Sequence, residues 1–265
     1  YVVSPYALQQ DFLDLKRVEV LRGPQGTVFG QSATGGIINA ITEKPDMAKF
    51  SGSVQLELGN YDLVRGTATL NVPLTDTLAI RGTVQRYYHK GFAVQTGLAP
   101  SYGRYGLDDA DRLSTKLSLL WEPSDSFSAQ LTAQYFTADE NGAAQKHVAD
   151  PDPDPRRISQ DYPNKYQLDF FLAYADLRYD LGFGTLKSLT SYQRTRNHNQ
   201  IDVDRLNYAS LGAYDVQPYW DNGVDAFSQE FNLTSNGNGP LSYIIGTYFL
   251  YQNLKQDILE YKGTD

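Results

Sequence analysis

Three histidines are the side chains of this sequence best suited to bind a transition metal. His89, His147 and His198 lie far apart in the chain, with no closely spaced pair among them. Three imidazoles can hold a metal when a fold brings them together, but a surface or loop position is the favoured interpretation of each. The chain also contains no cysteine, so thiolate metal sites and disulfides are excluded. We therefore predict no resident metal and no cofactor.

A run of alternating aspartate and proline, DPDPDPRR at residues 150–157, offers oxygen ligands for calcium. It lacks the glycine and glutamate spacing of an EF-hand loop, so a proline-stiffened loop is the favoured interpretation. No G-x-S-x-G, H-E-x-x-H or paired-carboxylate signature is present. The sequence thus predicts that the chain is not an enzyme.

The composition is that of a β-rich membrane protein. The 265 residues include 20 tyrosines and 12 phenylalanines, yet the mean hydropathy is −0.46. No apolar run approaches the about 20 residues that a membrane-spanning helix needs. A membrane protein this polar is expected to be a β-barrel, whose strands turn alternate residues to lipid and to the lumen. The net charge of −8 argues against nucleic acid as a partner.

Alternating apolar and polar residues predict about nine strands. The clearest example is 126–139, in which Phe127, Leu131 and Tyr135 alternate with Ser128 and Gln130. The predicted strands are 50–59, 61–73, 76–91, 110–122, 126–139, 166–181, 184–199, 224–236 and 240–258.

The connections alternate between short turns and long loops. The long ones are 92–109, 140–165 and 200–223. Short turns at one end and long loops at the other are the layout of an outer-membrane barrel. We expect one antiparallel meander, without a parallel pair. Even residues of 61–73 and 76–91 and odd residues of 126–139 should face lipid, so that Leu70, Val84 and Leu131 lie outside.

Residues 18–45, VEVLRGPQGTVFGQSATGGIINAITEKP, hold the most specific motif. Val18 and Val20 alternate with polar residues, so a strand is predicted up to Gly23, and 37–42 reads as a second strand. A phosphate-binding glycine loop is the alternative, but both GK(S/T) and G-x-G-x-x-G are missing. The segment strongly resembles the end of the plug domain of TonB-dependent outer-membrane receptors. The turn GNYD at 59–62 and SQEFNL at 228–233 resemble further motifs of that family.

The resemblance covers the whole chain and is strongest at 11–45 and 50–91. It implies an all-β membrane fold: residues 1–47 would be the C-terminal part of a small α+β plug, and residues 48–265 the N-terminal part of a 22-stranded transmembrane β-barrel. Because the only methionine, Met47, follows the plug motif, we expect the chain to be a fragment. The family's TonB box, first plug residues and remaining barrel strands would lie outside it. We expect 11–45 to pack on the polar, concave face of the sheet.

The resemblance also implies site residues. Arg22 matches the family position that joins an ion-pair cluster between plug and barrel; Glu19 is a candidate for the same network, and Glu230 a candidate partner. Ligand would be held by the plug top and the aromatic, cationic loops, because rings and arginines suit a flat anionic chelate. The candidates are Tyr1, Tyr6, Tyr102, Tyr105, Arg156, Arg157, Tyr214 and Trp220. Aromatic girdles at barrel rims are the competing explanation.

The implied function is TonB-dependent uptake of a ferric siderophore across the outer membrane of a Gram-negative bacterium. The expected partners are TonB, the iron–siderophore complex or a similar large nutrient, and outer-membrane lipid with lipopolysaccharide. Three alternatives remain open at this point. They are the same transporter with cobalamin, haem or a glycan as cargo, a passive porin or adhesin barrel, and a soluble β-rich binding domain.

Overall fold

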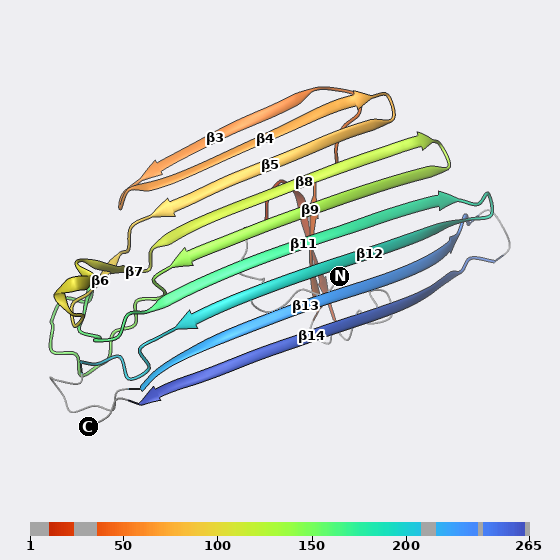
Figure 1. The fold of residues 1–265 in the computed structure, drawn as a ribbon. Coiled ribbons are helices and arrows are strands. Elements are labelled where there is room, and N and C mark those ends of the chain that lie inside the picture. Colours follow the sequence, from red (N-terminus) through yellow and green to blue (C-terminus); the bar gives the residue numbers. More distant parts are fainter. Residues whose placement is uncertain (1–10, 24–35, 208–215, 238–240, 263–265) are drawn as a thin grey trace.

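A nine-stranded antiparallel sheet forms most of the structure (Figure 1). The computed structural model describes residues 11–23, 36–207, 216–237 and 241–262. Strands that follow one another along the chain are neighbours in the sheet, so the sheet is a meander as predicted. In chain order the strands are β3 (Ser51–Gly59), β4 (Leu63–Thr75), β5 (Leu78–His89), β8 (Ala110–Ser124), β9 (Phe127–Glu140), β11 (Lys165–Asp180), β12 (Gly184–Gln200), β13 (Val216–Ser235) and β14 (Ile244–Lys262).

The two longer described loops build a small sheet of their own, which corrects the prediction that no strands pair in parallel. Its strands are β6 (Ala93–Gln95), β7 (Tyr105–Leu107) and β10 (Arg157–Ile158), and β10 runs parallel to β6. A short 3-10 helix, Pro100–Tyr102, lies between β6 and β7. Long loops held side by side must pair their own backbone groups, and alternation within single segments gives no sign of such pairing.

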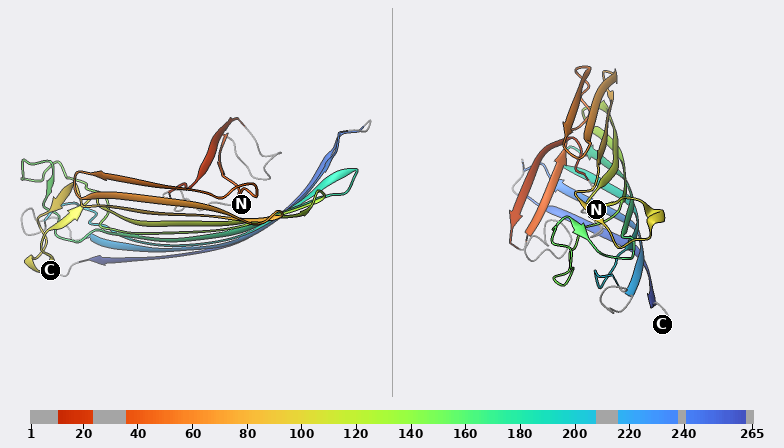
Figure 2. Two further views of the ribbon diagram at one scale, coloured as in Figure 1. Left: turned by 90° about the horizontal axis from the view of Figure 1, so that it is seen from above. Right: turned by 90° about the vertical axis from the view of Figure 1, so that its left-hand side faces the viewer.

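An N-terminal hairpin precedes the large sheet. It consists of β1 (Leu15–Arg22) and β2 (Gly36–Thr42), paired antiparallel, and both strands agree with the prediction. Gly36 pairs with Arg22 at φ +133°, and a Cβ there would collide with the Leu21 carbonyl. Only glycine tolerates this backbone. In Figure 2 the hairpin lies in the hollow of the curved sheet. We call that side of the sheet the inner face and the opposite side the outer face.

The two faces of the strands follow the predicted alternation. Leu70, Val84 and Leu131 are 48%, 44% and 49% exposed on the outer face. Their neighbours Gln85 and Gln130 lie on the inner face, where Gln85 contacts the hairpin and Gln130 is buried. Among the described residues, no helix is long and apolar enough to cross a membrane.

The inner face is not polar throughout, contrary to the expectation. A buried apolar cluster lies there on β9 and β11, formed by Phe136, Ala138, Leu168, Phe170 and Leu172. The cluster arises because consecutive residues in the middle of β11 are apolar, so apolar side chains lie on both faces of this strand. Polar inner residues dominate instead near the hairpin, on β4, β5 and β8.

Aromatic rings mark two levels on the outer face. Trp121 and Phe127, with ring centroids 5.8 Å apart, lie near the short turns. Phe171 and Tyr192, 6.4 Å apart, lie toward the loops, and Tyr135 is at the same level because it pairs with Phe171. Eight residues separate Phe127 from Tyr135 along β9, which is about 27 Å at about 3.4 Å per residue. A strand tilt of about 35–45° shortens this to about 20 Å along the barrel axis, a little less than the about 25 Å height of a barrel's apolar band.

The alternation predicts opposite responses to a charge on the two faces. In the full-length protein, Leu131→Arg should lower the free energy of unfolding by about 2–4 kcal/mol, because it places an arginine in the apolar band. Gln134→Arg, on the inner face of the same strand, should lower it by less than Leu131→Arg does, because the side chain on that face does not enter the apolar band. Urea unfolding in lipid vesicles measures both. Equal losses from the two variants would show that the faces are assigned wrongly.

Candidate functional site

A buried ion pair joins the segment before the hairpin to the inner face of the large sheet, which we call the wall. Asp14, at the turn into β1, accepts hydrogen bonds from Arg81 on β5: Nε to Oδ2 at 2.7 Å and Nη2 to Oδ1 at 2.6 Å. The side chains are only 7% and 18% exposed. Two parallel bonds to one carboxylate fix both the distance and the orientation of the partners. The backbone of Asp14 has φ +55°, which aspartate tolerates better than most residues.

A second cation and a second aspartate extend this contact across β8. The ammonium of Lys116, whose side chain is 3% exposed, lies 3.7 Å from Asp14 Oδ2 and 3.5 Å from the Glu43 carbonyl. Asp11 Oδ2 accepts hydrogen bonds from Gln85 Nε2 at 3.0 Å and Ser114 Oγ at 3.1 Å. We call the group Asp11, Asp14, Arg81 and Lys116, with Gln85 and Ser114, the dock.

An asparagine on the sheet also holds the chain that leaves the hairpin. Asn71 on β4 is fully buried. Its side chain accepts a hydrogen bond from the Asp46 amide at 2.8 Å and donates to the carbonyls of Asp46 at 2.8 Å and Lys49 at 2.9 Å. The hairpin is therefore held on its entry side by charge and on its exit side by backbone hydrogen bonds. In the described residues, 11–45 packs on the concave face as predicted.

The predicted ion pair of Arg22 with Glu19 or Glu230 remains a prediction. Glu19 accepts hydrogen bonds within the hairpin region, from Arg17 Nε at 2.7 Å and Asn39 Nδ2 at 3.3 Å. Glu230 lies on β13 and accepts one from Asn232. Sequence reasoning missed the dock, although Arg81 falls at an odd, inward-facing position of the predicted strand 76–91. A cation at an inward position was the available signal.

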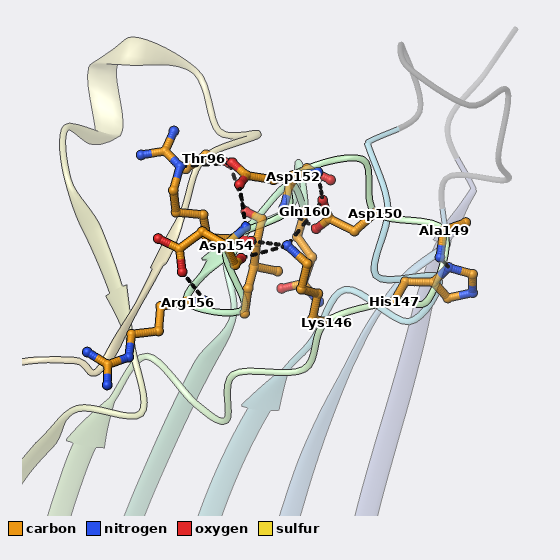
Figure 3. Close-up of polar contacts among 12 residues, drawn as sticks. Thr96, Lys146, His147, Ala149, Asp150, Asp152, Asp154, Arg156 and Gln160 are labelled. Carbon is orange, nitrogen blue, oxygen red and sulfur yellow. Dashed lines mark hydrogen bonds and ion pairs between the residues drawn. The ribbon is translucent and has the colours of Figure 1, made fainter.

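The lysine and aspartates of residues 146–157 hold the loops at this end of the sheet together through hydrogen bonds and ion pairs (Figure 3). The ammonium of Lys146 donates to the carbonyls of Asp154 at 2.9 Å and Arg157 at 2.5 Å, and lies 3.4 Å from Asp150. Asp150, Asp152 and Asp154 each accept a hydrogen bond from the amide two residues on. The aspartate oxygens that could have bound calcium thus accept hydrogen bonds from the loop backbone. This agrees with the predicted proline-stiffened loop.

The predicted ligand residues that the structure describes mostly hold the loops together. Tyr105 donates from its hydroxyl to the Asn164 carbonyl at 2.5 Å. Arg156 donates to the Tyr61 hydroxyl at 2.8 Å, and Arg157 pairs with Asp152 at 2.8 Å. Trp220 is partly buried on β13, where it pairs with Asn199 and Ile258. Tyr1, Tyr6, Tyr214 and the side chain of Tyr102 lie outside the described residues, and ligand contact stays a prediction for the whole set.

A cavity of about 580 Å³ lies between the loops and the inner wall. Its lining is rich in carboxylates, and most of these are already engaged. Glu140 forms two hydrogen bonds with Arg112, and Asp109 accepts from the Asn141 amide at 2.7 Å. Burial raises the pKa of Asp109. The hydroxyl of Tyr166, another lining residue, is buried with no partner among the described residues.

Asp202 is the most perturbed acid of this cavity. Burial, followed by a hydrogen bond with Asp204, raises its pKa to about 7. It accepts hydrogen bonds from the amides of Tyr162 at 3.3 Å and Arg205 at 2.7 Å. It therefore ties the loop at 201–207 to the loop that precedes β11.

The histidines occupy three separate environments. His89 is 6% exposed and stacks on Phe92 at 4.7 Å, so its surface assignment was wrong. His147 Nδ1 accepts a hydrogen bond from the Ala149 amide, and His198 Nδ1 lies 2.7 Å from Asp221. No three potential metal-binding side chains of His, Cys, Asp or Glu come together in the described residues.

The dock predicts the effect of removing its arginine. Arg81→Ala leaves the Asp14 carboxylate buried without its bidentate partner, and breaking a buried pair costs about 3–5 kcal/mol. We expect faster hydrogen exchange in β1 and β2, because the hairpin is held less firmly on the sheet. Arg65→Ala is the matched control, because Arg65 pairs with Glu57 on the same face without touching the hairpin. If the two variants behave alike, the dock does not hold the hairpin.

Asp202 predicts a pH-dependent loop contact. Because its folded pKa is raised to about 7, the folded loop binds the proton more tightly than the unfolded loop. The contribution to loop stability therefore falls as pH rises through that value. Hydrogen exchange at the Tyr162 and Arg205 amides, corrected for intrinsic exchange, should show greater protection at lower pH. Asp202→Asn should abolish the dependence; a pH profile unchanged by this substitution would contradict the assignment.

Comparison with known proteins agrees with this architecture. No family model matches the sequence. The pesticin receptor of Yersinia pestis is 42% identical over 69 residues, which is 26% of this chain and 10% of that protein. The probable TonB-dependent receptor BfrD of Bordetella pertussis is 32% identical over 121 residues, which is 43% of this chain and 16% of that protein.

The crystal structure of the ferric yersiniabactin uptake receptor FyuA from Yersinia pestis superposes with a TM-score of 0.77 at 21% identity. The match covers 94% of this chain and 38% of FyuA, so the chain spans less than two-fifths of that receptor. The likeness establishes the fold, a curved antiparallel sheet with a hairpin on its inner face. The sequence matches are to receptors, one of them named as a probable TonB-dependent receptor, so the chain is similar to TonB-dependent outer-membrane receptors over part of their length.

Proposed function

We propose that the receptor containing this chain imports a ferric siderophore through the outer membrane, with energy supplied through TonB. The wall and hairpin described above would then be parts of a gated channel. FyuA, which shares this fold, is named for the uptake of ferric yersiniabactin. This is a role in transport rather than in catalysis.

The observation that carries the proposal is the dock. A hairpin fixed inside a barrel wall by a buried carboxylate and two cations would obstruct a passive pore, and a diffusion channel has no use for it. When the hydrogen bonds and ion pairs of the dock break, water can hydrogen-bond to the separated polar groups, whereas water cannot replace the contacts of an apolar core. The dock therefore suits an obstruction that must be both firmly held and removable.

The mechanism follows from the energies of the two steps. Ligand binding at the mouth is an equilibrium event between the loops and the top of the plug. Separating Asp14 from Arg81 instead leaves a buried charge without its partner, and the free-energy cost is about 3–5 kcal/mol for one such pair. The hydrogen bonds of Asp11 and Asn71 must break as well. TonB would supply this work by pulling on the N-terminal box that the family carries ahead of its plug.

A different cargo for the same machine is the second candidate. The mouth cavity is lined by Asp109, Glu140 and Asp202, and its arginine, Arg112, is already engaged by Glu140. Such a lining favours a neutral or cationic solute, such as a glycan, over a strongly anionic chelate. Cobalamin and haem remain further possibilities for this position.

The siderophore proposal makes two separable predictions for the full receptor. Its synthesis should rise under iron starvation, and growth on the cognate ferric chelate should require TonB. Binding of the radiolabelled chelate to whole cells should persist without TonB, because docking needs no external work. Immunoblots and iron-55 uptake in matched strains with and without TonB measure both.

The outcomes distinguish the candidates. Induction by a sugar or by cobalamin limitation, with no response to iron, would keep the machine and replace the cargo. Uptake that continues unchanged without TonB would contradict the energised mechanism and favour a passive barrel.

A further inference from the structure

The cavity of about 580 Å³ at the mouth, between the loops and the inner wall, has a negatively charged lining. Its carboxylates belong to Asp108, Asp109, Glu140 and Asp202, and its arginine is Arg112. Arg112 donates two hydrogen bonds to Glu140, so these two charges balance one another. The three aspartates therefore give the lining a net negative charge.

The three aspartates are held by neutral donors. Each accepts a hydrogen bond from a backbone amide, which satisfies an oxygen lone pair but supplies no positive charge. The amides are those of Ala144 at 3.0 Å for Asp108, Asn141 at 2.7 Å for Asp109 and Arg205 at 2.7 Å for Asp202. Among the described residues, none of the three aspartates forms an ion pair with a lysine, arginine or histidine.

Burial increases the need of these carboxylates for a positive charge. It raises the pKa of Asp109, and it raises the pKa of Asp202 to about 7, because a low dielectric disfavours the charged form. The charge of Lys165 acts on Asp109, but Lys165 is itself paired with Asp139. A cation that enters the cavity would therefore be attracted by charges that the described residues leave unbalanced.

Aromatic rings and neutral acceptors line the same cavity. Phe92 is 44% exposed and stacks on His89, with ring centroids 4.7 Å apart. His89 Nδ1 lies 3.0 Å from the Lys90 carbonyl. That oxygen can only accept, so Nδ1 is the donor, and Nε2 of the neutral ring is an acceptor. The hydroxyl of Tyr166 is buried and has no partner among the described residues. A buried hydroxyl calls for a hydrogen-bond partner, and its oxygen can accept one from an N–H group.

We propose that the mouth cavity binds an organic ammonium group. A protonated amine offers N–H donors and no acceptor, so it matches the aspartates, His89 Nε2 and the Tyr166 oxygen, and the ring of Phe92 adds a cation–π contact. The aromatic wall suits an organic cation better than a metal ion, and no three metal-binding side chains come together in the described residues. One further step rests on the proposed function: the imported ferric chelate carries a free amine and is not strongly anionic.

Isothermal titration calorimetry of the purified full receptor tests the cavity with a matched pair of ferric trihydroxamates. Ferrioxamine B carries a free ammonium group, and its N-acetyl derivative is the same iron complex without that charge. We expect ferrioxamine B to bind about tenfold more tightly than the acetylated complex, from charge-assisted hydrogen bonds. Asp109→Asn/Asp202→Asn should remove most of this difference. Tyr166→Phe, which changes no charge, should reduce it while leaving the affinity for the acetylated complex unchanged.

The matched control is Asp62→Asn/Asp154→Asn, which removes the same charge from exposed positions outside the cavity at the same end of the protein. It should keep the preference for ferrioxamine B, and heat-modifiable migration of each variant checks that it is folded. Spermidine is a third arm: binding as tight as that of ferrioxamine B, lost in Asp109→Asn/Asp202→Asn, would confirm the ammonium site and identify a free amine as its ligand.

The inference is overturned if the two ferric complexes bind equally, if neither ferrioxamine B nor spermidine binds, or if the two double variants behave alike. TonB-dependent iron-55 uptake without any preference for the amine would refute this inference and leave the proposed function standing. A preference for the amine together with uptake that is independent of TonB would do the reverse.

Discussion

The rest of this structure depends on one buried charge, the Asp14 carboxylate, which lies between the N-terminal hairpin and the large sheet. Asp14 cannot be left alone in a site where it is 7% exposed, because an unpaired buried carboxylate is strongly destabilising. Arg81 and Lys116 must therefore face inward from adjacent strands at the right height. The register of β5 with β8, which places Thr83 opposite Lys116, supplies that arrangement. The position of the hairpin thus depends on strand alternation and not on an apolar core.

The alternation of side chains along each strand suits the different surroundings of the two faces of the sheet. Odd residues of β5 meet the hairpin and the lumen, whereas even residues such as Val84 meet lipid. A shift of one residue would place Arg81 in the membrane and Val84 against Asp14, because side chains alternate with a period of two. Register is therefore fixed by both faces together. Contact with the hairpin on the inner face and the apolar surface of the outer face are consequences of one pattern, and the inner apolar cluster around Phe170 is a local departure from it.

Much of the fold could be predicted from the sequence because its signals are local. Alternation located all nine strands of the large sheet, and the motif at 18–45 located the hairpin. The dock depends on a contact between residues 67 positions apart, and parity alone says which face Arg81 occupies but not which plug residue meets it. Pairing of β10 with β6 likewise joins two loops. Nothing within either loop reveals the other as its partner, and the hydrogen bonds of Tyr105 and Arg156 were hidden for the same reason.

The central claim is that the plug must leave the wall at the dock for transport to occur. The chain has no cysteine, so Asp11→Cys/Ser114→Cys introduces one disulfide where the two side chains already touch at 3.1 Å. In a full receptor in which any other cysteines are replaced by serine, uptake of the cognate ligand is measured before and after reduction. The account predicts that the oxidised receptor binds ligand but does not transport it, and that reduction restores uptake. Full TonB-dependent uptake with the disulfide intact would contradict it.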